Sequence, residues 1–104
     1  MRCNVYLIKA EIDDIVQYKI GLSKHPQKRI LELKTANPNI IDVVVQYETK
    51  NREYASFIEK SLHNHYKFNS IDGEWFKEID YVQFVQLCEK FEHIAISCSK
   101  IGRI

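Results

Sequence analysis

Two runs of β-forming residues lie so close together near the start of the chain that they can pair only as an antiparallel hairpin. Residues 4–9 read Asn-Val-Tyr-Leu-Ile-Lys and residues 17–21 read Gln-Tyr-Lys-Ile-Gly. Too few residues separate them for the crossover that parallel strands need. Because side chains alternate between the two faces of a strand, we expect Tyr6 and Lys19 to point to one side of this hairpin and Tyr18 to the other.

A helix and a valine-rich strand are predicted next. Ser23 is a favourable N-cap residue and Pro26 is tolerated in a first helical turn, so a helix is expected to begin here. Asn37-Pro38 ends it, because the residue before a proline resists the α conformation. Residues 40–48 (Ile-Ile-Asp-Val-Val-Val-Gln-Tyr-Glu) favour a strand, and the valine run predicts burial on both faces and a central place in the sheet.

The second half of the chain predicts two further helices with a turn between them. Asn51 is expected to cap a helix that runs to about Tyr66, with apolar residues every four positions. Asp72-Gly73 is typical of a hairpin turn. Asp80 is expected to cap the last helix.

Together these elements predict a small mixed α/β (α+β) domain with the order β-β-α-β-α-α. Its sheet is expected to have three mostly antiparallel strands flanked by helices. Residues 94–104 fit either a short terminal strand or a docked tail. A chain of 104 residues is expected to form a single domain over residues 1–104, since two independent cores would not fit.

The composition is typical of a soluble globular protein. Hydrophobic residues make up 45% and charged residues 28%, which excludes wholesale disorder. No apolar run approaches the ~20 residues of a membrane span, and the first residues do not resemble a secretory leader. The three cysteines (Cys3, Cys88 and Cys98) include no Cys-x-x-Cys pair. We therefore expect a reducing compartment, namely the cytoplasm, or the host-cell cytoplasm if the protein is viral.

Positive charge is concentrated in one segment of a nearly neutral chain. The formal net charge is +1, and residues 1–52 hold nine basic and six acidic residues. Within residues 19–34, five basic residues accompany a single acidic one, Glu32. Such a patch suits a ligand that carries phosphate, although a solvated helix face is the simpler reading of the composition alone.

Four sequence features occur in an order that is typical of one nuclease superfamily. Residues 4–6 (Asn-Val-Tyr) are followed by residues 19–21 (Lys-Ile-Gly), by Arg29, by residues 59–63 (Glu-Lys-Ser-Leu-His) and by residues 73–76 (Gly-Glu-Trp-Phe). The first two segments stand where the GIY-YIG superfamily has its two name-giving motifs, and Arg29 follows at the family spacing. The chain resembles this superfamily, and in particular its small phage-type branch with YKIG and GEWF motifs.

The resemblance covers about residues 4–80 and leaves a C-terminal helix and tail over residues 81–104. It implies a GIY-YIG-like fold and a divalent-metal-dependent endonuclease, a phosphodiester hydrolase that cuts DNA and leaves 5′-phosphate and 3′-hydroxyl ends.

The same resemblance implies a role for each of four side chains. Glu59 would bind one Mg²⁺ or Mn²⁺ ion through its carboxylate. Arg29 would neutralise charge on the phosphate, and Tyr6 would position or deprotonate the attacking water. Lys19 occupies the second tyrosine position of the family pattern and would act as a general base.

Further residues are expected to assist. Tyr18 and His63 are candidate auxiliary residues. The basic residues Lys24, Lys28 and Lys34 are expected to contact the DNA backbone. A domain of this size has little surface for reading bases, so a homodimer or a partner protein would supply sequence specificity.

Two differences from the family pattern keep other functions open. Leu33 stands where many members have His or Tyr, and the late Asn of the family has only Glu74 or Asn69 as candidates. One alternative is a GIY-YIG-like nucleic-acid-binding module that has lost catalysis. The other is a protein-interaction domain that uses the acidic second half of the chain and Trp75-Phe76.

Overall fold

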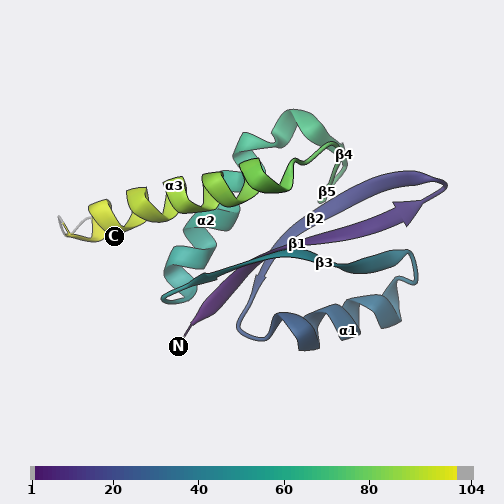
Figure 1. Ribbon diagram of the computed structural model, residues 1–104, viewed down its shortest axis with the longest axis horizontal. Helices are drawn as coiled ribbons and strands as arrows, with labels where there is room; N and C mark the ends of the chain where they lie inside the picture. The colour runs from purple at the N-terminus through teal and green to yellow at the C-terminus, as the bar shows by residue number, and fades with distance from the viewer. Residues whose placement is uncertain (1, 101–104) are drawn as a thin grey trace.

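The computed structural model describes residues 2–100, which form a five-stranded antiparallel sheet with helices on both faces (Figure 1). The elements follow in the order β1 (Cys3–Ile12), β2 (Ile15–Ser23), α1 (Pro26–Ala36), β3 (Ile40–Thr49), α2 (Arg52–His65), the 3₁₀ helix η1 (Lys67–Asn69), β4 (Ser70–Asp72), β5 (Trp75–Phe76) and α3 (Tyr81–Lys100). The predicted mixed α+β fold is confirmed. No helix within residues 2–100 combines the length and the apolar character that crossing a membrane requires.

Strand β1 lies inside the sheet and is buried on both faces. The strand order is β3-β1-β2-β5-β4. Val5 and Leu7 pack into the core with residues of α2 and α3, whereas Tyr6, Ile8 and Ala10 pack with Ile30 of α1. Figure 1 shows α1 on one face of the sheet and α2 and α3 on the other. This alternation follows from the two-residue period of a strand. It places Tyr6 on the α1 face of the sheet.

The sheet has five strands rather than the predicted three, because a short hairpin joins its edge. Gly73 turns this hairpin with φ at +58°, a left-handed conformation that glycine adopts without steric cost. Strand β5 pairs with β2 through Tyr18 opposite Phe76 and Lys19 opposite Trp75, and β4 pairs with β5. Strands of two or three residues are too short to show a hydrophobic period, so the sequence did not predict them.

The prediction that residues 40–48 form a central strand is wrong, since β3 is an edge strand. Its valines are half-buried on both faces: Val43 packs against the α1 side of the core, and Val44 and Val45 pack against the α2 and α3 side. An apolar run indicates that both faces of a strand are buried, and helices above and below the sheet can cover both faces of an edge strand as well as of a central one. The composition therefore predicted two covered faces correctly and could not predict the edge.

Two predictions at helix ends also change. Ser23 does not cap α1; its Oγ accepts the His25 N–H at 3.0 Å, and the helix begins at Pro26, whose missing N–H needs no cap. Asp80 caps α3 as predicted, through Oδ1 and a backbone N–H at 3.0 Å. Residues 94–100 continue α3, so they form neither a strand nor a docked tail, and residues 101–104 lie outside the described part of the chain.

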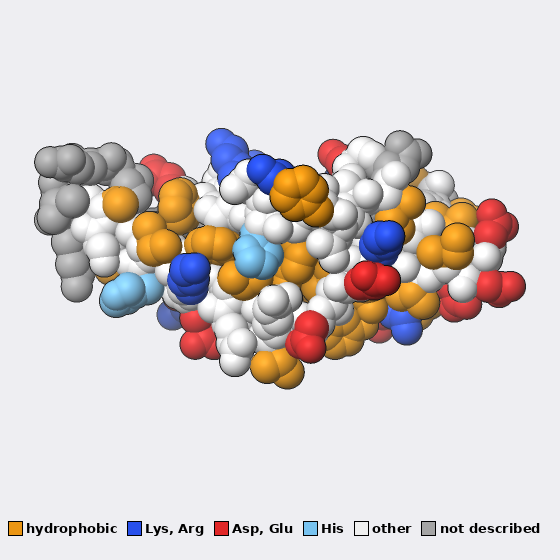
Figure 2. All heavy atoms as spheres, turned by 90° about the horizontal axis from the view of Figure 1, so that it is seen from above, with side chains coloured by type: hydrophobic (Ala, Val, Ile, Leu, Met, Phe, Trp, Pro, Cys, Tyr) orange, Lys and Arg blue, Asp and Glu red, His pale blue; other side chains and the backbone are white. Residues whose placement is uncertain are grey.

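Charged side chains of both signs are interspersed on the side of the molecule that α2 and α3 cover (Figure 2). Hydrophobic side chains also reach this face, and several of them adjoin one another near its centre. Phe68 is the most exposed of the large hydrophobic residues described, at 88%, and the Lys67 Nζ lies 5.2 Å from the centre of its ring. On the face that Figure 2 shows, the acidic residues do not gather into one patch.

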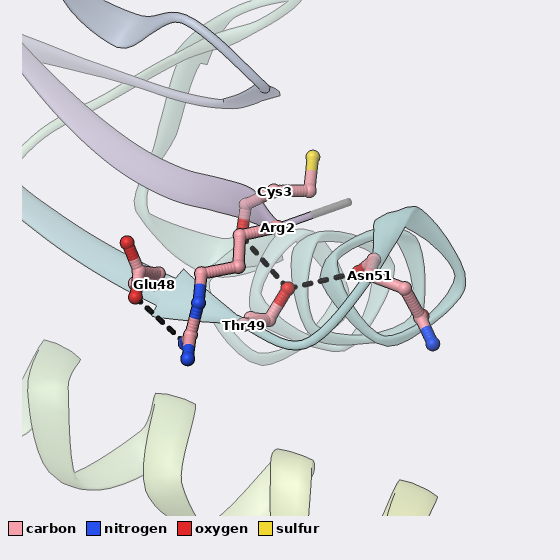
Figure 3. A network of polar contacts seen from close by, with 5 residues as sticks. All are labelled: Arg2, Cys3, Glu48, Thr49 and Asn51. Carbon is pink, nitrogen blue, oxygen red and sulfur yellow. Dashed lines mark hydrogen bonds and ion pairs between the residues drawn. The ribbon is translucent and has the colours of Figure 1, made fainter.

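A buried hydroxyl joins the starts of β1 and α2 to the end of β3 (Figure 3). Thr49, 1% exposed, places its Oγ1 2.8 Å from the Cys3 carbonyl and 2.9 Å from the Asn51 carbonyl. Asn51 caps α2 as predicted, and its side chain accepts a backbone N–H of the first turn at 3.0 Å. Arg2 and Glu48 add an exposed ion pair at 2.8 Å. The junction fixes where α2 leaves the sheet.

The Tyr6 ring lies directly over Gly21. The two residues are opposite each other in the β1–β2 register, and Ile8 is opposite Lys19. Cross-strand partners share a face, so Tyr6 and Lys19 lie on one side of the hairpin, as predicted. A Cβ on Gly21 would come within 2.7 Å of the Tyr6 ring carbon Cε1 and closer still to the hydroxyl. Only glycine leaves room for the ring at this position.

Gly21→Ala is therefore expected to destabilise the protein by about 1–3 kcal/mol, the usual cost of forcing a methyl group into a packed site. In a Tyr6→Val background the ring is absent, so the same substitution should cost little, since alanine loses less conformational freedom on folding than glycine. Urea unfolding of the four proteins, followed by circular dichroism, measures these free energies. Equal costs in both backgrounds would contradict the proposed contact.

Candidate functional site

One cleft of about 450 Å³ brings together side chains from four elements and from the turn between β4 and β5. Tyr6 reaches it from β1, Lys19 from β2, Arg29 from α1 and Glu59 from α2. The residues that the motifs singled out thus line a common cleft. Arg52, Ser56, His63 and Glu74 line it as well.

The cleft lies where the edge of β2 loses its neighbouring strand. Strand β5 pairs only with Tyr18 and Lys19. The next residues of β2 (Ile20, Gly21 and Leu22) have no partner in β5, and all three line the cleft. The shortness of β5 therefore leaves part of the β2 edge open beside α2.

His63 satisfies the backbone at this open edge. Its Nε2 lies 3.2 Å from the Ile20 carbonyl, and because a carbonyl only accepts, Nε2 donates. The imidazole also contacts Phe76 edge-on, with ring centres 5.2 Å apart. His63 therefore holds α2 against β2 at the margin of the cleft, next to Glu59 on the same helix.

Arg29 lies next to the Tyr6 hydroxyl at the α1 side of the cleft. The Tyr6 hydroxyl, followed by the Glu32 carboxylate, raises the pKa of Arg29. The Arg29 Nη1 lies 3.2 Å from the Glu32 Oε2, and the side chains of this pair are about half exposed. Exposed pairs of this kind contribute little to stability. The guanidinium thus lies beside Tyr6 and, with only an exposed partner in Glu32, remains open to an anion.

Lys19 is engaged in an ion pair with Glu74. The Lys19 Nζ lies 2.9 Å from the Glu74 Oε2, and this contact with Lys19 lowers the pKa of Glu74. The Lys19 side chain is 23% exposed, whereas that of Glu74 is 70% exposed. The pairing of Lys19 with Trp75 brings the preceding residue, Glu74, to this position.

Glu59 is a half-buried carboxylate on the cleft face of α2. Burial raises its pKa, against the opposing effects of His63 and Arg52. A carboxylate that has lost part of its hydration favours either a proton or a cation. Glu59 is thus the group in the cleft best suited to a positively charged ligand.

The four polar residues of α2 in the cleft follow a helical spacing. Arg52, Ser56, Glu59 and His63 are separated by four, three and four positions, so they lie on one face of α2. The sequence analysis did not single out Arg52 or Ser56. Their spacing from Glu59 is the signal that would have found them.

Tyr18 lies away from the cleft. It is on the opposite face of the sheet, where its ring contacts Tyr81 edge-on at 5.8 Å and the two hydroxyls lie 3.3 Å apart. Burial raises the pKa of Tyr18. The structure therefore does not place Tyr18 beside the other candidate residues.

The three lysines that were expected to contact a backbone are not equivalent. Lys28 lines a smaller hollow that adjoins the cleft at Arg29. Lys24 is exposed in the turn before α1. Lys34 follows Arg29 by five positions, about 140° around the helix, and does not line the cleft.

The two candidates for the late Asn of the family pattern are separated. Glu74 lines the cleft, whereas the Asn69 Nδ2 donates to the Lys77 carbonyl at 3.0 Å and closes the β4–β5 hairpin. Leu33 packs against the core on the α1 side of the sheet.

The carboxylates present fit a magnesium site better than a zinc site. Within residues 2–100, no group of three or more His, Cys, Asp and Glu side chains is placed to hold a metal ion together. Zinc sites need three or four such ligands. Magnesium is commonly held by one or two carboxylates together with water and phosphate oxygens, and Glu59 supplies one such carboxylate.

Glu59→Gln is expected to stabilise the protein at neutral pH. The pKa of Glu59 is higher in the folded state than in the unfolded state, so the folded state binds a proton more tightly. The free energy of unfolding therefore falls as pH rises through the raised pKa. Glutamine removes the cost of burying an ionised carboxylate. The variant should therefore have a higher free energy of unfolding than the wild type at pH 7, and this difference should vanish near pH 4. Urea unfolding at both pH values measures it.

Glu53→Gln is the matched control, because Glu53 is exposed in the first turn of the same helix and interacts favourably with the helix dipole. This variant should show no gain at pH 7. A gain for Glu59→Gln that persists at pH 4 would contradict a desolvated carboxylate.

Most of the chain matches a described domain family. A family model described as the T5orf172 domain matches residues 4–94, a segment that contains every residue of the cleft. Searches of curated proteins and of solved structures give no match. Because the matched segment covers most of the chain, the protein belongs to the T5orf172 domain family.

Proposed function

We propose that the protein is a divalent-metal-dependent endonuclease of GIY-YIG type, which hydrolyses DNA phosphodiester bonds with low intrinsic sequence specificity. The family supports a nuclease-like or DNA-binding role. The observation that carries the finer proposal is the convergence of Tyr6, Lys19, Arg29 and Glu59 on one cleft. A hydroxyl, an amine, a guanidinium and a carboxylate from four elements can together position an attacking water, accept its proton, neutralise charge on the phosphate and hold a metal ion.

Arg29 would bind the scissile phosphate. Hydrolysis adds negative charge to the phosphate in the transition state, and a guanidinium can neutralise it with paired N–H donors. The ion pair with Glu32 is exposed and weak, so phosphate oxygens can replace the carboxylate. Tyr6, beside Arg29, limits the orientations that the guanidinium can take.

Tyr6 and Lys19 would act on the attacking water. The Tyr6 side chain is buried under the cleft and held over Gly21, so its hydroxyl is pre-oriented to position a water molecule. Lys19 is paired with Glu74 in the free protein. Lys19 can act as a base only in its neutral form, and the Glu74 carboxylate favours the charged form. We therefore expect substrate binding to separate Lys19 from Glu74.

Glu59 would hold one Mg²⁺ or Mn²⁺ ion. When bound, such an ion lowers the pKa of a coordinated water and neutralises charge on phosphate oxygens. A cation would also offset the desolvation that raises the Glu59 pKa. The ion would therefore relieve the unfavourable burial of the Glu59 carboxylate.

Arg29→Ala is expected to lower the rate of plasmid cleavage by about 10²–10³-fold, as is typical when a group that stabilises transition-state charge is lost. Glu59→Gln should lower it at least as far while DNA binding is retained. Nicking of supercoiled plasmid and fluorescence anisotropy with duplex DNA measure the two properties. Lys90→Ala, on the exposed side of α3, is the control and should cut as the wild type does.

Removal of divalent metal should abolish cleavage, and Mg²⁺ or Mn²⁺ should restore it. EDTA followed by stepwise addition of each ion tests this on the same plasmid. Cleavage that continues in EDTA would refute the metal requirement.

A nucleic-acid-binding module without catalysis is the second candidate. The Lys19–Glu74 ion pair favours it, because a paired ammonium is a poor base. This candidate is supported if the wild type binds DNA tightly but does not cut it with either Mg²⁺ or Mn²⁺. The only effect of Arg29→Ala would then be a lower affinity for DNA.

A further inference from the structure

A second hollow of about 590 Å³ continues the cleft along α2. It is lined by Arg52, Glu53, Ser56, Phe57 and Lys60, and is called the Phe57 hollow below. Arg52 and Ser56 line both the Phe57 hollow and the cleft. The two spaces therefore meet along one face of the helix, within two turns of Glu59.

Phe57 is a half-buried aromatic residue outside the described core. Its side chain is partly exposed, and it belongs to neither of the core clusters found among residues 2–100, which take Ile58 and Leu62 from the same helix. Part of the ring is therefore accessible from the Phe57 hollow. A partly exposed ring in a hollow offers a flat apolar surface, which is the platform on which a nucleobase stacks.

The charges around the Phe57 hollow suit a phosphate. Arg52 and Lys60 contribute two cations, and Glu53 contributes one acid. Arg52 lies at the boundary with the cleft, because it lines both spaces. A ligand with one flat base and one phosphate would place the base at Phe57 and the phosphate at the cations.

We propose that the Phe57 hollow is a subsite for the nucleotide that neighbours the scissile phosphate on the same DNA strand. Its base stacks on Phe57 and its phosphate contacts Arg52 and Lys60. The proposal rests on the proposed function, because continuity with the cleft is what makes the occupant part of the substrate strand. Stacking on Phe57 requires an unpaired base, since a base within a duplex does not expose its face to a side chain.

The test measures binding without cleavage. The wild-type chain in EDTA is titrated into a fluorescent short oligothymidylate and into an abasic oligomer of the same length, and anisotropy gives the affinities. The wild type should prefer the oligomer with bases. Phe57→Ala should lower the affinity for oligothymidylate by about 5- to 100-fold, the range for loss of one stacked base, and leave the abasic oligomer unaffected.

Matched variants separate stacking from packing and from charge. Phe57→Tyr keeps a ring and should bind as the wild type does, whereas Phe57→Leu keeps the bulk and should bind as Phe57→Ala does. Arg52→Ala should weaken binding to both oligomers and reduce the slope of log affinity against log salt by about 0.7. Circular dichroism verifies that each variant is folded.

The outcomes distinguish the subsite from the nuclease activity. Binding of oligothymidylate that is unchanged in Phe57→Ala, or an equal loss on the abasic oligomer, overturns the subsite even if the protein cuts plasmid. Phe57-dependent binding by a protein that cuts nothing supports base stacking in the Phe57 hollow, but it refutes the proposed function and, with it, the place of this base beside a scissile phosphate.

Discussion

The contact between the Tyr6 ring and Gly21 is the interaction on which the rest of the cleft depends. It locks the β1–β2 register in the arrangement that places Lys19 on the Tyr6 face. A slip of one residue would turn every side chain of the strand to the opposite face. The same contact brings the Tyr6 hydroxyl to Arg29. One glycine thus allows two strands and one helix to present their polar groups at the same place.

The cleft exists because secondary structure stops early on one side of β2. Strand β5 begins with Trp75, opposite Lys19, and runs away from the rest of β2, so it leaves Ile20 unpaired by a strand. His63 binds the Ile20 carbonyl instead. Helix α2 is in turn fixed at its start by Thr49 and Asn51, which join it to β1 and β3. Backbone pairing and one capped helix therefore set the distance between the two walls of the cleft.

The cleft holds charge that does not serve stability. Burial disfavours the Glu59 carboxylate, and Lys19 is largely covered beside Glu74. Buried or half-buried charges cost free energy unless they are paired. The surrounding core of β1, α2 and α3 offsets this cost. A perturbed carboxylate together with cations in a cleft is the arrangement expected of a functional site rather than of a solvated helix face.

Local sequence patterns were enough to predict the longer helices and strands and the faces of the β1–β2 hairpin. Asn51 and Asp80 capped helices as expected, and Tyr6 and Lys19 share a face because side chains alternate with a period of two. The motif order also identified Tyr6, Lys19, Arg29 and Glu59, but only the tertiary structure decided that they line one cleft. It also decided that β3 is an edge strand and that Lys19 pairs with Glu74, since edges and ion pairs depend on contacts between distant segments that no local pattern records.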